Sequence, residues 1–126
     1  MATVLVVDDN PDACKTMARL VTQCGHEGVC VTSGEAALAF VHGRPVDLII
    51  LDNMMPGIDG MEVLRRLRAD PATAALPVVM WSAVADREFV DHAKRKGATD
   101  YWVKATFSYA NLSGMLGRVL AGGCDG

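Results

Sequence analysis

The stretch that decides the fold reads VDLIILDNMMPGIDG and occupies residues 46–60. Its first half is an apolar, partly β-branched run, which predicts a strand buried on both faces, as in a parallel sheet. The run ends at Asp52, and the Pro56-Gly57 pair that follows predicts an immediate turn. Because open parallel sheets bind ligands at the carboxyl ends of their strands, Asp52 is placed either for chemistry or, more simply, to cap the turn.

A second acidic feature favours chemistry. Residues 3–7, TVLVV, predict another buried strand, and it runs directly into Asp8 and Asp9. If the two strands are parallel neighbours, these side chains and Asp52 meet at one sheet edge, where three carboxylates repel one another unless a cation compensates. Hard oxygen ligands that leave coordination positions open suit Mg²⁺. The sequence therefore predicts a magnesium site that is ready to receive a phosphoryl group.

Composition narrows the class of protein. The 126 residues predict one domain, at residues 1–121, followed by a flexible tail at 122–126. Hydrophobic residues make up 51% and charged residues 21%, which excludes a disordered chain, and the net charge of −3 does not favour nucleic-acid binding. No apolar run approaches the roughly 20 residues of a membrane span, and the first strand is too short for a signal peptide. We expect a cytoplasmic protein.

The four cysteines show no metal-binding or redox spacing. Cys14, Cys24, Cys30 and Cys124 contain no CxxC pair and have no matching histidines, so neither a zinc site nor a redox pair is expected. Three of them fall in predicted regular elements, where a cysteine behaves as a small buried hydrophobe.

The rest of the chain alternates strands with helices. Further strands are predicted at 27–31, 77–81 and 100–103, and helices at 11–24, 34–42, 60–68, 86–96 and 108–121. This alternation predicts a parallel sheet covered by helices on both faces. In the third helix we expect Arg65, Arg66 and Arg68 to form a solvated face rather than a phosphate site.

Polar side chains recur where four of the five predicted strands end. The set is Asp8 with Asp9, then Asp52, Ser82 and Lys104. Each has an ordinary structural explanation alone, Ser82 as a cap and Lys104 as a surface lysine. Because the carboxyl ends of parallel strands meet at one edge, their recurrence indicates a functional site.

This arrangement resembles the receiver domain of two-component response regulators. The matching residues are Asp8-Asp9, the D-x-x-M-P-x-x-D-G run at 52–60, Ser82-Ala83 and the segment 97–104 that ends in Lys104. The resemblance spans nearly the whole chain. It implies an α/β, flavodoxin-like three-layer fold with five helices and a five-stranded parallel sheet in the order 2-1-3-4-5.

The resemblance also implies a role for each site residue. Asp52 is expected to be the nucleophile that forms an acyl phosphate. The expected Mg²⁺ ligands are Asp9, Asp52 and the backbone carbonyl of Met54, with Asp8 acting through bound water. Lys104 would neutralise charge on the phosphoryl oxygens, and the Ser82 hydroxyl would bind the new phosphate. Tyr101 resembles the family's aromatic switch residue, which moves inward once Ser82 vacates its space.

The implied function is a phosphorylation-activated signalling switch and not an enzyme that acts on other molecules. The expected donor is a sensor histidine kinase, a phosphotransfer protein or a small phosphodonor, and the expected target is a downstream protein that reads the face around Tyr101. No direct nucleic-acid or membrane partner is expected, and the chain should be a monomer or weak homodimer. Autodephosphorylation should be slow, because Met54 and Val84 are apolar and neither can orient a hydrolytic water.

Three rival functions share parts of this pattern. A phosphatase with a phospho-aspartate intermediate needs a second acid two residues after the nucleophile, where this chain has Met54. A flavin-binding domain needs a phosphate-binding loop after the first strand, where Asp8 and Asp9 would repel the phosphate. A third alternative is a phosphorylation-independent interaction module on the same fold, which the side chains do not strongly favour because the acids, the serine and the lysine are all present.

One position departs from the family pattern. The family has a proline after the active-site lysine, commonly joined by a cis bond, whereas Ala105 follows Lys104 here. A cis bond before a non-proline residue costs about 3 kcal/mol, so we expect a trans bond. The path of the loop then shifts, and we expect Lys104 to contact Asp52 only loosely and this loop to be more mobile than its neighbours.

Overall fold

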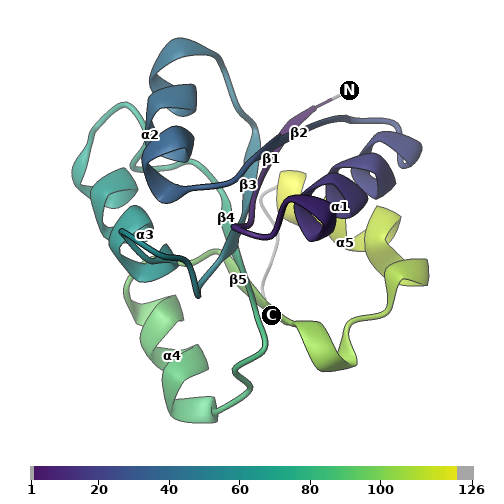
Figure 1. The fold of residues 1–126 in the computed structure, drawn as a ribbon. Coiled ribbons are helices and arrows are strands. Elements are labelled where there is room, and N and C mark those ends of the chain that lie inside the picture. The colour runs from purple at the N-terminus through teal and green to yellow at the C-terminus, as the bar shows by residue number, and fades with distance from the viewer. Residues whose placement is uncertain (1, 122–126) are drawn as a thin grey trace.

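The computed structural model describes residues 2–121 as a five-stranded sheet between two layers of helices (Figure 1). The strands are β1 (Thr3–Val7), β2 (Glu27–Val31), β3 (Leu48–Asp52), β4 (Val78–Ser82) and β5 (Asp100–Val103). All neighbouring strands are parallel, in the order β2-β1-β3-β4-β5. The predicted topology is therefore confirmed. The tail expected at 122–126 lies outside the described residues.

Within residues 2–121, five α-helices cover the two faces of the sheet. They are α1 (Pro11–Gln23), α2 (Gly34–Gly43), α3 (Gly60–Ala69), α4 (Arg87–Arg95) and α5 (Leu112–Leu120). Helices α2, α3 and α4 lie on one side of the sheet, and α1 and α5 on the other (Figure 1). The first four are capped at their N-termini, where the side chains of Asn10, Ser33, Asp59 and Asp86 accept hydrogen bonds from backbone N–H groups of the first turn.

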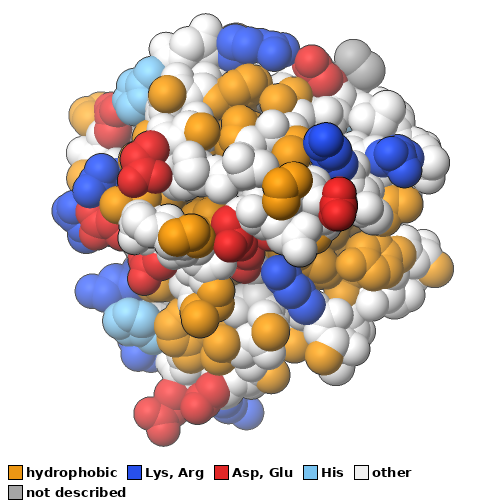
Figure 2. Space-filling view, in the orientation of Figure 1, with side chains coloured by type: hydrophobic (Ala, Val, Ile, Leu, Met, Phe, Trp, Pro, Cys, Tyr) orange, Lys and Arg blue, Asp and Glu red, His pale blue; other side chains and the backbone are white. Residues whose placement is uncertain are grey.

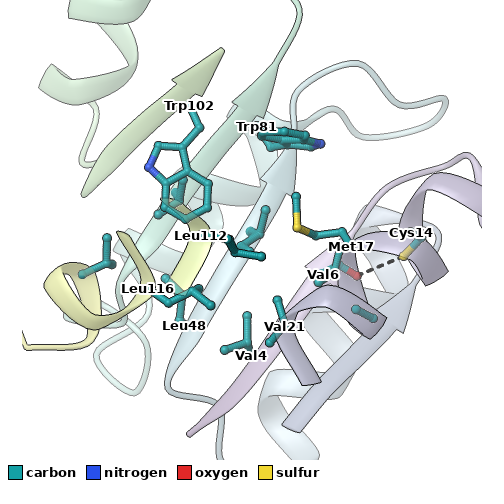
Figure 3. Close-up of a cluster of buried hydrophobic side chains, with 14 residues drawn as sticks. Val4, Val6, Cys14, Met17, Val21, Leu48, Trp81, Trp102, Leu112 and Leu116 are labelled. Atoms are coloured by element: carbon teal, nitrogen blue, oxygen red, sulfur yellow. Dashed lines mark hydrogen bonds between the residues drawn. The ribbon is translucent and has the colours of Figure 1, made fainter. Parts of the chain in front are cut away.

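The central strands are apolar throughout because each of them serves two cores. Val6 and Ile50 point toward α1 and α5, whereas their chain neighbours Val7 and Leu51 point toward α2, α3 and α4. Figure 3 shows the first of these clusters, in which side chains from the sheet meet those of α1 and α5. Each fully buried aliphatic side chain contributes about 1.5–3 kcal/mol, so both faces of the sheet are needed for stability.

The last helix begins later than predicted. Two single turns of 3₁₀-helix, η1 (Lys104–Thr106) and η2 (Tyr109–Asn111), precede α5, which starts only at Leu112. Phe107 lies between these turns and packs against Trp81 and Trp102, with ring centroids 4.9 and 5.1 Å apart. This tertiary packing overrides the apolar spacing from which an earlier helix start was predicted.

The expectation for Arg68 was wrong. Arg65 and Arg66 do lie on the exposed face of α3, where both contact Glu62. Arg68 instead turns inward and is half-buried. Its guanidinium donates to the carbonyl oxygens of Gly97 at 2.8 Å and Leu76 at 2.7 Å. It thus ties α3 to the segments that flank β4 and α4.

The expectation that no cysteines would pair was also wrong. Cys14 in α1 and Cys30 in β2 form a disulfide, with Cα atoms 5.7 Å apart and a sequence separation of 16. The pairing joins a helix to the strand it packs on, a relation that CxxC spacing does not encode. The Cys14 sulfur also lies 3.3 Å from the carbonyl oxygen of Val6, dashed in Figure 3, which places the disulfide against the backbone of β1.

The described surface carries charges of both signs. Acidic, basic and hydrophobic side chains are intermixed across the face drawn in Figure 2, in keeping with the formal net charge of −3. Within residues 2–121, every helix falls short of the length and apolar character that crossing a lipid bilayer requires.

Candidate functional site

Sheet register brings the acidic residues together. Val7 pairs with Leu51 in the parallel ladder, so the next residues, Asp8 and Asp52, emerge side by side at the carboxyl end of the sheet. One carboxylate oxygen from each of Asp8, Asp9 and Asp52 lies within 4.8 Å of the others. Asp8 and Asp52 are buried and Asp9 is exposed. The predicted acid cluster is therefore present, and it opens to solvent on one side.

The loop after β3 fixes the direction of Asp52. The backbone N–H of Met54 donates to the Asp52 carboxylate at 3.3 Å, while the Met54 side chain is 66% exposed. Gly57 has a φ of +79°, which strongly favours glycine. Gly60 donates to the Asn53 carbonyl, and a Cβ atom at Gly60 would stand 2.5 Å from the Asp52 carbonyl oxygen. The D-G pair thus lets α3 start directly against the acidic strand end.

Burial makes the charge of Asp52 costly. Its side chain is 6% exposed, and burial is the main cause that raises its pKa from 3.8 to about 6. The positive charge of Lys104 acts in the opposite direction, and the negative charge of Asp8 adds to the rise. Two buried carboxylates with one exposed neighbour fit a small divalent cation, because such an ion would relieve this repulsion and prefers carboxylate oxygen.

Lys104 reaches the acids, but loosely. Its Nζ lies 3.5 Å from an Asp52 oxygen and 3.7 Å from an Asp8 oxygen, longer than the roughly 2.8 Å of a charge-assisted hydrogen bond. None of the peptide bonds among the described residues is cis, so the bond from Lys104 to Ala105 is trans. Both expectations for this departure from the family pattern are confirmed. The expected mobility of the loop stays a prediction.

Ser82 and Tyr101 share one partner that the sequence did not reveal. The fully buried Ser82 hydroxyl accepts a hydrogen bond from the Val84 N–H at 3.0 Å. The Tyr101 hydroxyl donates to the Val84 carbonyl oxygen at 2.7 Å, and the ring is buried against Phe89. The N–H group of Val84 therefore bonds the expected phosphate-binding hydroxyl, and its carbonyl group bonds the expected switch residue. No sequence motif marks a contact made by backbone atoms.

Two further side chains border the site. The Oδ1 atom of Asn53, next to Asp52, is buried and has no hydrogen-bond partner among the described residues. The ring of Trp81, the residue before Ser82, lies 5.8 Å from the Lys104 Nζ. Neither residue was assigned to the site from the sequence. The one available signal was the position of each, directly beside an expected site residue at a strand end.

Comparison with known proteins is consistent with this geometry. The sequence matches the family model described as response regulator receiver domain over residues 4–115. Protein PilH of Pseudomonas aeruginosa is 30% identical over 97% of this chain and 100% of its own length. The gliding motility regulatory protein of Myxococcus xanthus is 36% identical over 92% of this chain but only 15% of its own length.

The fold is shared as well. The structure of the chemotaxis protein CheY4 of Vibrio cholerae aligns with a TM-score of 0.86 at 30% identity, covering 94% of this chain and 98% of that one. The chain spans about half of the transcriptional regulators that it also matches, and the whole of Protein PilH.

Proposed function

Because this chain belongs to the receiver-domain family of two-component response regulators, a family of phosphorylation-regulated signalling proteins, we propose that Asp52 is its phosphoryl acceptor. The observation that supports this most strongly is the setting of Asp52. It lies at the end of the central strand, beside Asp8 and Asp9, with the Lys104 ammonium 3.5 Å away. This is the only group of three such side chains with metal-ligand geometry within residues 2–121.

The reaction is transfer of a phosphoryl group to a carboxylate. An Asp52 oxygen attacks phosphorus, and the bond from phosphorus to the donor's leaving atom breaks. The leaving group, the imidazole of a kinase phosphohistidine or the carboxylate of a small acyl phosphate, departs with the bonding electrons. Lys104 neutralises charge on the phosphoryl oxygens during transfer. Asp9, Asp52 and the Met54 carbonyl, with Asp8 through water, would hold Mg²⁺, which supplies further positive charge there.

Signal readout passes through the loop after β4. On this proposal the Ser82 hydroxyl, which accepts from the Val84 N–H at 3.0 Å, turns toward the phosphoryl group and the Val84 backbone shifts with it. Val84 also holds the Tyr101 hydroxyl through its carbonyl oxygen, so a shift of this residue changes the anchoring of Tyr101. Phosphorylation then biases an equilibrium between two arrangements of this face rather than building a new fold.

The face that carries this signal is formed by β5, α4 and α5. A groove of about 720 Å³ runs beside β5, and its lining includes Tyr101, Phe107, Met115 and Arg118. We assign the downstream protein to this face and the kinase or phosphotransfer protein to the acidic edge. On this proposal the chain works in the cytoplasm as a monomer or weak homodimer, with no direct nucleic-acid or membrane partner, and loses its phosphoryl group slowly.

Radiolabelling tests the acceptor. The parent protein should take up label from a small acyl phosphate such as acetyl phosphate in the presence of Mg²⁺, and Asp52→Ala should abolish this uptake. Asp91→Ala, at an exposed carboxylate on α4, is the matched control and should label like the parent. Label that persists in Asp52→Ala would refute the assignment of Asp52. A parent protein that takes up no label would instead favour the phosphorylation-independent interaction module.

A phosphate mimic tests the readout. Addition of beryllofluoride with Mg²⁺ should change the NMR signals of the Tyr101 ring and of the Val84 amide together, because the backbone of Val84 bonds both Ser82 and Tyr101. In Tyr101→Phe, which removes the hydroxyl and keeps the ring, the Val84 amide should still respond. Identical Tyr101 signals with and without the mimic would contradict the switch.

A further inference from the structure

The acids hold the Lys104 ammonium only loosely. Its side chain is 32% exposed, and the distances of 3.5 and 3.7 Å to Asp52 and Asp8 are those of loose ion pairs. The residues that follow it, Ala105 and Thr106, are exposed and complete the single turn η1. A long lysine side chain at such a position has several rotatable bonds, so something else must restrict the directions it takes.

Space is available for the ammonium to move away from Asp52. A cavity of about 220 Å³ adjoins the site between α1 and the loop after β5. Its lining includes Lys104 and Asp8, together with Thr16 and Met17 of α1 and the rings of Trp81 and Tyr109. A lysine that turned into this cavity would lose its place over Asp52.

Trp81 is the side chain that faces the ammonium from the sheet. Its ring centroid is 5.8 Å from the Lys104 Nζ, within the range in which an aromatic face attracts a cation. The indole is 5% exposed, and the scarcity of water around it strengthens that attraction relative to an exposed pair.

The indole is itself held in place by the residues that follow Lys104. Phe107 meets the Trp81 ring edge to face at 4.9 Å, and Tyr109 does so at 6.2 Å. Phe107 also stacks on Trp102, the residue that pairs with Trp81 across the β4–β5 ladder, at 5.1 Å. The loop that carries the lysine is thus anchored on the same ring that attracts its ammonium.

From this geometry we propose that Trp81 is a positioning residue for Lys104: its indole face, braced by Phe107 and Tyr109, holds the ammonium over Asp52 and out of the neighbouring cavity. The consequence for phosphoryl transfer rests on the function proposed above. The placement of the lysine by the indole does not, and it can be tested separately.

Labelling kinetics with acetyl phosphate and Mg²⁺ test the consequence. Trp81→Leu should slow phosphoryl uptake by about 5- to 30-fold, the range expected for loss of a buried cation–π contact, and Trp81→Phe should restore the rate to within about threefold of the parent. Trp102→Phe is the matched control, because it changes the paired tryptophan of the same cluster, which stacks on Phe107, and it should label like the parent.

A double-mutant cycle separates positioning from a general loss of structure. In a Lys104→Met background, Trp81→Leu should cause no further slowing, because the group that it positions is already absent. If Trp81→Leu slows uptake by the same factor with and without the lysine, the proposal is overturned. Equal rates for Trp81→Leu and the parent would overturn it as well.

Fluorescence tests the placement of Lys104 without phosphoryl transfer. The variants used keep an aromatic ring at residues 81 and 102. In Trp102→Phe, where Trp81 is the only tryptophan, adding Lys104→Met should shift the emission, because a charge near the indole is removed. In Trp81→Phe, where Trp102 remains, the same change should leave the emission unaltered. A shift in the first protein alone supports the placement even if the parent takes up no label, in which case the proposed function fails and this contact stands. No shift in the first protein overturns the proposal.

Discussion

Replacing Asp52 by asparagine should stabilise the protein at neutral pH. The carboxyl is 6% exposed, and burial is the main cause that raises its pKa from 3.8 to about 6. The folded state therefore binds this proton more tightly than the unfolded state does. Above about pH 6 the ionised carboxylate opposes folding, and below pH 3.8 the penalty vanishes because the group is protonated in both states.

The magnitude follows from that difference in pKa. One pKa unit corresponds to about 1.4 kcal/mol, so the rise from 3.8 to about 6 corresponds to about 3 kcal/mol at pH 7. An asparagine side chain would keep the shape of the aspartate and carry no charge. We expect Asp52→Asn to raise the free energy of unfolding by about 2–3 kcal/mol at pH 7.5 in the absence of Mg²⁺, and by much less at pH 4.

Urea unfolding followed by far-ultraviolet circular dichroism measures this directly. The parent and the variant are compared at pH 4 and pH 7.5, with Asp91→Asn on the exposed face of α4 as the control, which should change stability by less than about 0.5 kcal/mol. Mg²⁺ should stabilise the parent more than the variant, because the variant lacks one of the expected ligands. An Asp52→Asn protein no more stable than the parent at pH 7.5, or stabilised equally at both pH values, would refute the reasoning.

Three further changes test other parts of the structure. Met54→Asn combined with Val84→Glu should shorten the life of the phosphoryl group by about tenfold or more, because polar side chains can orient a hydrolytic water; unchanged decay of the label would contradict this. Arg68→Met should lower the free energy of unfolding by about 2–3 kcal/mol in urea, since it leaves partly buried carbonyl groups without their donor, whereas Arg65→Met, at an exposed ion pair, should cost clearly less. Reducing the disulfide between α1 and β2 should lower stability by about 2–3 kcal/mol, and equal urea midpoints with and without dithiothreitol would count against it.

The strands, the helix caps and the meeting of the acids were predictable because each depends on local sequence. An apolar run such as residues 48–51 has few alternatives to a buried strand, and Asp59 followed by a helical pattern marks a cap. Once two such strands are taken to be parallel neighbours, the acids that follow them must meet. The trans bond after Lys104 was predictable for a similar reason, since it follows from the chemistry of Ala105 alone.

The features that were missed all depend on contacts between distant segments. Arg68 turns inward because the carbonyl groups of Leu76 and Gly97 lie close to it. The sequence pattern of α3 holds no information about the position of those distant groups. The pairing of Cys14 with Cys30 depends on how α1 lies across β2. The shared bonding of Val84 involves only its backbone atoms, so no residue type at that position signals it.

The sheet separates two hydrophobic cores, so substitutions in one core have little effect on the other. Trp81 packs in the core formed with α1 and α5, whereas Tyr101 packs in the core formed with α2, α3 and α4. Substitutions in cores that share no side-chain contact have nearly additive effects on stability. The α4 side of the face around Tyr101 can therefore change toward new partners while the core formed with α1 and α5 keeps Lys104 and the Trp81 indole in place. Such proteins can acquire a new partner and still keep the arrangement that accepts the phosphoryl group.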